Sequence, residues 1–255
     1  MYLKKLFSLV LLFALWGCQP DKKQDQETNL NLSFKLKEGG IPYNFNQVFK
    51  TNQGYRVLVN TLKFYLSHIY LHTQNNDSVL INDLGLIDFG NAEKQEIKTS
   101  PANNTYQGIS LFLGVPANLN GTSNPDFDPS IFGNSHPLNL INNMYWTWNT
   151  GYIFLKIEGK IDTTGIENVP LTNNWFYHNG IDALYTYKKW DIPFNYPEKT
   201  NKTIVFTIDL KTFLEGDSNN SIDIKANPFS HTTDNFALAQ RVMNNFVGSI
   251  SISTE

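Results

Sequence analysis

Apolar and polar residues alternate along most of the chain with the two-residue period of half-buried strands. In the first such run, Leu30, Leu32, Phe34 and Leu36 point to one side, and a Gly-Gly pair follows the run. The pattern therefore predicts about ten short strands and an all-β fold. Further runs of this kind cover 55–71, 80–89, 109–115, 151–158, 203–210, 222–224 and 249–253.

One stretch near the C-terminus departs from this pattern and predicts a helix. Apolar residues recur every three or four positions over 236–248, where a glycine ends the run. Thr232, Thr233 or Asp234 is expected to cap that helix. No repeat of fixed period and no domain boundary is visible. The prediction is one antiparallel β-sandwich over residues 30–255, with long loops and one short C-terminal helix.

The residues before this domain predict export. Two lysines precede an apolar run from Leu6 to Trp16, which has signal-peptide length and is short for a membrane span. The run ends in L-W-G-C, which resembles a bacterial lipobox. We therefore expect residues 1–17 to be a lipoprotein signal peptide, Cys18 to carry lipid, and 18–29 to be a flexible tether. The alternative is an ordinary signal peptide with an incidental cysteine.

The cysteine count and the predicted anchor together indicate the cell envelope. Cys18 is the only cysteine, so the chain forms no intrachain disulfide. A lipid-anchored protein of this kind is expected at the outer membrane, facing the periplasm or the cell surface. The leaflet that carries the anchor stays open.

Composition and motifs exclude several function classes. The hydrophobic fraction of 41% is enough for a core, and the net charge of −3 comes without a basic stripe after the first residues. Nucleic acid is therefore not an expected partner. The sequence lacks H-E-x-x-H, G-x-S-x-G, a P-loop and G-x-G-x-x-G, which favours a non-enzymatic protein without ruling out a hydrolase.

The stretch 136–159 concentrates residues that bind or react with redox metals. It holds His136, Met144, Trp146 and Trp148, which supply an imidazole, a thioether and two oxidisable indoles. Such soft and borderline donors suit copper better than magnesium or calcium. Core packing is the more frequent role of any single aromatic residue here. Two roles therefore remain open for Met144, that of a copper ligand and that of a residue that fills the core.

Three strings in the chain resemble one known family. M-Y-W-T-W-N-T-G-Y-I-F-L-K-I-E-G at 144–159 looks like the signature of the MbnP-like family of exported copper-binding proteins. W-F-Y-H-N-G at 175–180 and H-T-T-D-N at 231–235 agree with the same family. The chain is also distantly similar to the methanotroph surface proteins MopE and CorA. The similarity extends over most of the chain after the leader, and these strings are its most specific part.

This resemblance implies a copper-binding protein for copper capture or handling, with a site built on histidine. The histidines beside the three strings are His136, His178 and His231, and Trp146 and Trp148 would line the site. Some members carry a tryptophan oxidised to kynurenine, which here would need a separate haem peroxidase-like partner. The kynurenine of MopE cannot be transferred by position, because Trp148 stands here where MopE has a ligand histidine.

Other interpretations of these residues stay open. Asp234, three residues after His231, is suited either to cap the helix or to orient a ligand imidazole. His68 and His72 lie too far apart along one strand to share a metal and are expected to be solvated. The chain as a whole also suits a metal-free carbohydrate-binding module with exposed aromatics. A copper-dependent oxidase would further need a coordination position open to substrate.

Overall fold

The computed structural model describes residues 28–75, 77–121, 127–148, 151–216 and 220–255. The predicted signal peptide 1–17 and the predicted lipidation site Cys18 lie outside these residues, as does nearly all of the predicted tether. Within the described ranges, no helix is long and apolar enough to cross a membrane.

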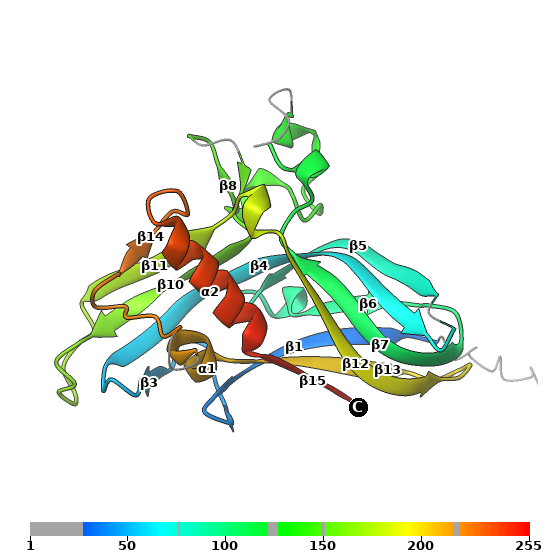
Figure 1. Ribbon diagram of the computed structural model, residues 1–255, viewed down its shortest axis with the longest axis horizontal. Helices are drawn as coiled ribbons and strands as arrows, with labels where there is room; N and C mark the ends of the chain where they lie inside the picture. Colours follow the sequence, from blue (N-terminus) through cyan, green and yellow to red (C-terminus); the bar gives the residue numbers. More distant parts are fainter. Residues whose placement is uncertain (1–27, 76, 122–126, 149–150, 217–219) are drawn as a thin grey trace, which may run out of the picture.

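Two sheets make up the body of the protein, which is an all-β, sandwich-like fold as the alternation predicted (Figure 1). The smaller sheet contains, in spatial order, β15 (Ile250–Thr254), β13 (Lys202–Asp209), β1 (Leu30–Glu38) and β2 (Ile41–Pro42), with β6 (Glu96–Thr99) also paired to β1. Ring contacts across the two sheets, such as Phe34 with Phe64 at 5.9 Å and Phe206 with Trp190 at 5.5 Å, form part of the core between them.

The larger sheet is organised around one long central strand, β4 (Arg56–Thr73). Its spatial order is β12 (Thr186–Tyr196), β7 (Asn104–Leu113), β4, β10 (Leu155–Asp162), β11 (Asn173–Asn179) and β14 (Phe229–Ser230). Two further strands, β3 (Val48–Lys50) and β5 (Ser78–Asp88), also pair with β4. A separate two-stranded ribbon joins β8 (Tyr145–Trp146) to β9 (Gly151–Tyr152).

Both main sheets are mixed, so the prediction of a purely antiparallel sandwich was wrong. β1 pairs with β13 in parallel, and β11 pairs with β14 in parallel. Alternation within one strand shows which face is buried but not which strand lies beside it. Parallel strand pairs join segments that are far apart in the sequence, and a local pattern of apolar residues carries no information about such pairs.

The helical content also differs from the prediction. Besides α2 (Phe236–Gly248), a second short helix, α1 (Leu210–Glu215), follows β13, where the sequence predicted no helix. Asp209 caps α1, because its carboxylate accepts the backbone N–H groups of Lys211 and Thr212. Six residues are too few to show helical periodicity. The N-cap of α2 is Asn235, whose side chain accepts the Leu238 N–H, and not Thr232, Thr233 or Asp234.

Three strand predictions need correction. Residues 151–158 do not form one strand, because β9 ends at Tyr152 and β10 begins at Leu155. The two residues between these strands, Ile153 and Phe154, are both buried. Ile222 and Ile224 are buried, but segment 222–224 is not a strand. The pattern missed β12, because its lysines and Pro193 are unusual in strands. β12 is an edge strand, and its register with β7 shifts between Asp191 and Phe194. Lysine and proline are tolerated at such positions.

The described residues of 116–152 lie above the larger sheet in the view of Figure 1 and carry the ribbon β8–β9. This segment contains the 3₁₀ turns η2 (Ala117–Leu119), η3 (Pro129–Ile131) and η4 (Leu140–Asn142). The other 3₁₀ turns among the described residues are η1 (Ala92–Lys94) and η5 (Asp182–Leu184). Helix α2 packs against β11 and beside α1. The Asn179 side-chain amide donates to the Ala239 carbonyl of α2 at 2.9 Å.

Strand β10 depends on a glycine where it lies closest to its neighbours. The register with β4 shifts between Glu158 and Gly159, and a Cβ on Gly159 would clash with the Leu58 carbonyl oxygen and lie 2.8 Å from Nε1 of Trp175. We predict that Gly159→Ala lowers the free energy of unfolding by about 1–3 kcal/mol, because the backbone on both sides has to move.

Chemical denaturation followed by circular dichroism measures this loss. Gly133→Ala is the matched control, because a Cβ there meets nothing within 4 Å. Equal stability of the two variants would contradict the close approach of β10 to β4.

Candidate functional site

Strand pairing places two histidines side by side. In β11, Trp175 and Tyr177 are buried while Phe176 and His178 lie on the half-exposed face, as the alternation predicted. The parallel pairing of Phe176 with Phe229 and Tyr177 with Ser230 brings the residue after β14 beside the end of β11. The rings of His178 and His231 lie 5.4 Å apart, centroid to centroid. Residues 53 positions apart in sequence thus become neighbours.

The loop after β14 is held by a buried threonine. Thr232 has a left-handed φ of 74° and is fully buried. Its hydroxyl donates to the carbonyl of His178 at 3.0 Å and accepts the N–H of Gly180 at 3.1 Å. This pair of hydrogen bonds fixes the distance between the two histidines.

A carboxylate on the neighbouring strand orients His178. Nε2 of His178 lies 2.7 Å from Oε1 of Glu158 on β10. A carboxylate only accepts hydrogen bonds, so Nε2 carries the proton and Nδ1 keeps its lone pair. Burial lowers the pKa of His178 despite the opposing effect of Glu158, so the ring is neutral near pH 7. The hydrogen bond from His178 lowers the pKa of Glu158 to about 2.

A second carboxylate lies beside His231. Asp234 accepts the backbone N–H of His231 at 2.9 and 3.0 Å, and its Oδ2 lies 3.7 Å from Nδ1 of the same ring. Asn235 caps α2, so Asp234 does not fill the first of the two roles open to it. Its carboxylate charge lies beside Nδ1 of His231, beyond hydrogen-bond distance, so that Nε2 is the ring nitrogen that faces away from it.

Aromatic rings surround the two histidines. Trp148 meets His231 edge to face at 5.7 Å, and Phe176 lies 4.8 Å from His231 and from His178. Trp146 contacts Trp148 at 5.8 Å. Trp148 is 64% exposed and Trp146 only 4%, and Nε1 of Trp146 is a buried donor that has no hydrogen-bond partner among the described residues. The two tryptophans therefore touch each other in different environments.

The third predicted histidine has a separate environment. His136 stacks on Phe132 at 4.1 Å, and its Nδ1 accepts the Leu138 N–H at 3.1 Å. Burial lowers its pKa. Among the described residues, no group of three or more His, Cys, Asp or Glu side chains is placed to hold a metal ion. His136, His178 and His231 are thus not assembled into one cluster, and Met144 is 1% exposed within the hydrophobic core.

The remaining histidines, on β4, form hydrogen bonds of their own. His68 lies 3.0 Å from the Tyr185 hydroxyl, and His72 lies between Ser110 at 2.7 Å and Ser78 at 3.0 Å. Both are half-buried rather than solvated as predicted. The strand pattern located them correctly, but it could not show side chains reaching from β5, β7 and the turn before β12.

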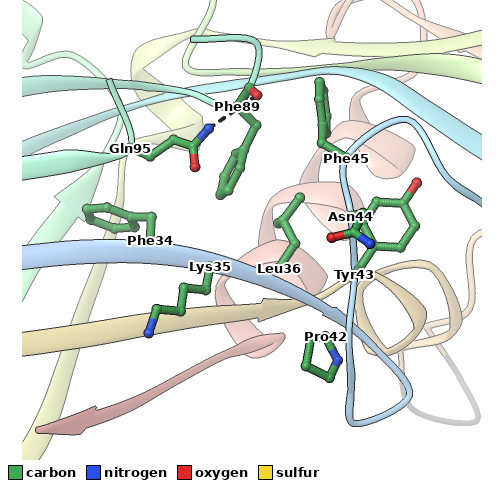
Figure 2. A pocket seen from close by; sticks show the side chains of 9 residues that line it. All are labelled: Phe34, Lys35, Leu36, Pro42, Tyr43, Asn44, Phe45, Phe89 and Gln95. Atoms are coloured by element: carbon green, nitrogen blue, oxygen red, sulfur yellow. Dashed lines mark hydrogen bonds between the residues drawn. The ribbon is translucent and has the colours of Figure 1, made fainter. Parts of the chain in front are cut away.

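A pocket of about 370 Å³ lies elsewhere and shares no lining residue with the histidine pair. Figure 2 shows Phe34, Phe45 and Phe89 around it, with the Gln95 amide donating to the Phe89 carbonyl at 3.4 Å. Its lining is mostly apolar and contains no histidine or carboxylate.

Together these observations define an all-β sandwich-like protein with a pair of carboxylate-supported, aromatic-flanked histidines at one edge of its larger sheet. The chain matches the family model MbnP over residues 27–234 and belongs to the MbnP family, which is associated with copper and methanobactin. Among solved structures it is similar to MbnP from Methylosinus trichosporium, with 16% identity, a TM-score of 0.47, and coverage of 73% of this chain and 76% of that chain. No curated protein matches the chain.

The charge of Glu158 makes the stability of this site depend on pH. A carboxyl whose folded pKa is about 2 and whose ordinary value is 4.5 stabilises the fold above pH 4.5, and this contribution is lost as pH falls toward 2. We predict that Glu158→Gln, which retains an acceptor but removes the charge, lowers the free energy of unfolding at pH 7 by on the order of 1–2 kcal/mol. The difference from wild type should shrink by pH 3.

Urea unfolding at pH 7, 5 and 3 measures this difference. Glu96→Gln, at an exposed position of β6, is the control and should stay close to wild type throughout. A Glu158→Gln deficit that is the same at all three pH values would contradict a charge-based role.

Proposed function

We propose that this protein binds one copper ion in the envelope, with His178 and His231 as ligands, and that it captures or handles copper rather than turning over a substrate. The observation that carries the proposal is the pair of adjacent imidazoles, each with a carboxylate beside one ring nitrogen. Membership of a copper-associated family agrees with it.

The donor chemistry suits Cu(I). A metal ligand has to be a neutral imidazole, and burial keeps His178 neutral at physiological pH. Among the described residues, no hydrogen bond involves Nδ1 of His178 or Nε2 of His231, so each lone pair is available. Copper accepts borderline nitrogen donors, and two imidazoles satisfy the low coordination number of Cu(I).

The surroundings favour the reduced ion as well. Trp148 contacts His231 and Phe176 contacts both histidines, so these rings cover part of the pair. Cu(II), which is better hydrated, would lose more by entering such a site than Cu(I). His136 and Met144 are left out of the proposed ligand set, because the first is stacked on Phe132 and the second is buried in the core.

Trp148 is the tryptophan most accessible to oxidation near the proposed copper. It touches His231 and is 64% exposed, whereas Trp146 is buried behind it. Conversion of a tryptophan to kynurenine would require a separate haem peroxidase-like partner, since the sequence contains no haem-attachment motif. We therefore propose this modification only for protein isolated from its own organism, and only if such a partner is present there.

The carbohydrate-binding alternative gains no support. A glycan platform needs coplanar exposed rings, but Trp148 is inclined by 50° to Trp146 and by 87° to His231. The copper site is therefore the better explanation of the exposed indole.

Copper titration of histidine variants tests the ligand set. We expect wild type to take up one Cu(I) in competition with a chromogenic Cu(I) chelator such as bicinchoninate. His178→Ala and His231→Ala should each weaken binding by at least about tenfold, and the double variant should bind none, because one imidazole cannot hold the ion alone.

Two single variants serve as controls in this titration, with circular dichroism confirming the fold of each. His136→Ala and His72→Ala should bind copper as wild type does. Full binding by the double variant would refute the proposal, and loss of binding in His136→Ala would restore the three-histidine set.

We further propose that the protein is a lipoprotein anchored through Cys18 at the outer membrane. The lipobox-like end of the apolar run supports this assignment. Expressed in a bacterium with its full leader, the wild type should sediment with membranes, and Cys18→Ser should be released or left unprocessed. A wild-type protein that is fully soluble, with a mature N-terminus other than residue 18, would contradict the anchor.

A further inference from the structure

A second polar cluster connects strands β4 and β5 to the turn before β12. The Tyr185 hydroxyl lies 2.8 Å from Oγ of Ser67 and 3.0 Å from Nδ1 of His68. Nε2 of the same imidazole lies 3.4 Å from Oδ1 of Asp83. The four side chains form one line from a fully buried serine to a carboxylate that is 70% exposed.

The backbone at His68 is strained in a way that serves this arrangement. His68 has a left-handed φ of 48°, and the register of β4 with β7 shifts between Ser67 and Tyr70. A non-glycine residue in this conformation is unusual and is retained where the surroundings enforce it. The bulge presents consecutive side chains, Ser67 and His68, to the same phenolic oxygen.

The positions of the hydrogens follow from the chemistry of each group. The negative charge of Asp83, 3.4 Å from Nε2 of His68, favours a proton on that nitrogen. Oγ of Ser67 donates to the Gly114 carbonyl at 3.0 Å, so Oγ and Nδ1 of His68 are both acceptors for the proton of the Tyr185 hydroxyl. Burial raises the pKa of Tyr185, so the phenol keeps its proton at neutral pH. Nδ1 of His68 lies 3.0 Å from the phenolic oxygen, which satisfies the distance requirement for proton transfer.

The ring of Tyr185 is enclosed by aromatic neighbours. Phe112 stacks on it at 4.6 Å with an interplanar angle of 7°, and Phe154 meets it edge to face at 6.3 Å. Ser67 is fully buried, so it cannot serve as a nucleophile toward a substrate in solvent. The cluster therefore suits internal proton movement better than hydrolysis.

We propose that Tyr185 is a redox-active tyrosine whose proton acceptor is His68. A strong one-electron oxidant, of the class formed when metals react with peroxide, takes one electron from the phenol and is itself reduced by one electron. The phenolic O–H bond breaks, its proton bonds to Nδ1 of His68, and the products are a neutral tyrosyl radical and an imidazolium beside Asp83. Ser67 positions the phenolic oxygen, and Asp83 positions the imidazole.

This inference is independent of the copper ligands. It rests on the hydrogen-bonded line and on the strained backbone, both on the β4 side of the fold. In a protein that handles a redox metal, reversible oxidation of this tyrosine would protect other side chains from irreversible oxidation.

Photo-oxidation of the full chain by a ruthenium tris-bipyridyl complex with persulfate tests the proposal. Rapid-freeze electron paramagnetic resonance should detect a tyrosyl radical in wild type that is lost in Tyr185→Phe. Tyr187→Phe is the matched control: Tyr187 is 51% exposed and contacts the same Phe112 ring at 5.1 Å. Oxidation governed by exposure alone would remove the signal in Tyr187→Phe instead, and that result would overturn the proposal.

The role of the base is tested by His68→Asn, because asparagine tolerates the left-handed backbone but offers no imidazole. Radical formation should slow by at least about tenfold and lose its solvent deuterium isotope effect. An unchanged rate and isotope effect would overturn the assignment of His68. If a variant fails to fold, spin-trap adducts mapped by mass spectrometry in photo-oxidised wild type decide the matter, with an adduct at Tyr185 expected and one confined to Tyr187 contradicting the proposal.

Discussion

The parallel pairing of β14 with β11 is the constraint on which the candidate site depends. Two short segments, 53 residues apart between His178 and His231, are aligned by strand hydrogen bonds and by the Thr232 hydroxyl, which bridges the backbone on either side of Asn179. The positive φ of Thr232 turns the chain back toward α2 directly afterwards. A rigid sheet edge thus carries the loop that supplies the second imidazole, as expected where function is placed on loops held by a stable scaffold.

The His178 and His68 clusters share one electrostatic feature. In each, a carboxylate beside one imidazole nitrogen favours a proton there and leaves the lone pair on the other nitrogen. Glu158 fixes a proton on Nε2 of His178 through a 2.7 Å hydrogen bond, and the charge of Asp83, 3.4 Å from Nε2 of His68, favours the same tautomer there. At His178 the remaining nitrogen is the one proposed to bind copper, whereas at His68 it faces the Tyr185 hydroxyl. In the two proposals, the same pairing of carboxylate and imidazole serves metal binding at a sheet edge and proton transfer at a bulge.

Burial and exposure separate two residues that the sequence presents as equivalent. Trp146 and Trp148 are two positions apart and would share one face of an extended strand. β8 ends at Trp146, so the chain turns after it and Trp148 stands exposed beside His231. The different environments leave Trp148 exposed and place Trp146 in the core.

The sequence alone determined the all-β class, the last helix and the inward face of most strands, because alternation and helical spacing record burial directly, as in Leu30 to Leu36 or Trp175 to His178. Family-like strings also pointed to His178, His231 and Trp148. Which histidines meet was decided only by tertiary structure: His231 reaches His178 through strand pairing, while His136 stacks on Phe132. The cluster of Tyr185 with His68 was equally invisible, because a left-handed bulge and contacts across more than a hundred residues leave no local periodicity. Local pattern encodes which side of an element is buried, and only the packed fold decides which distant side chains share that space.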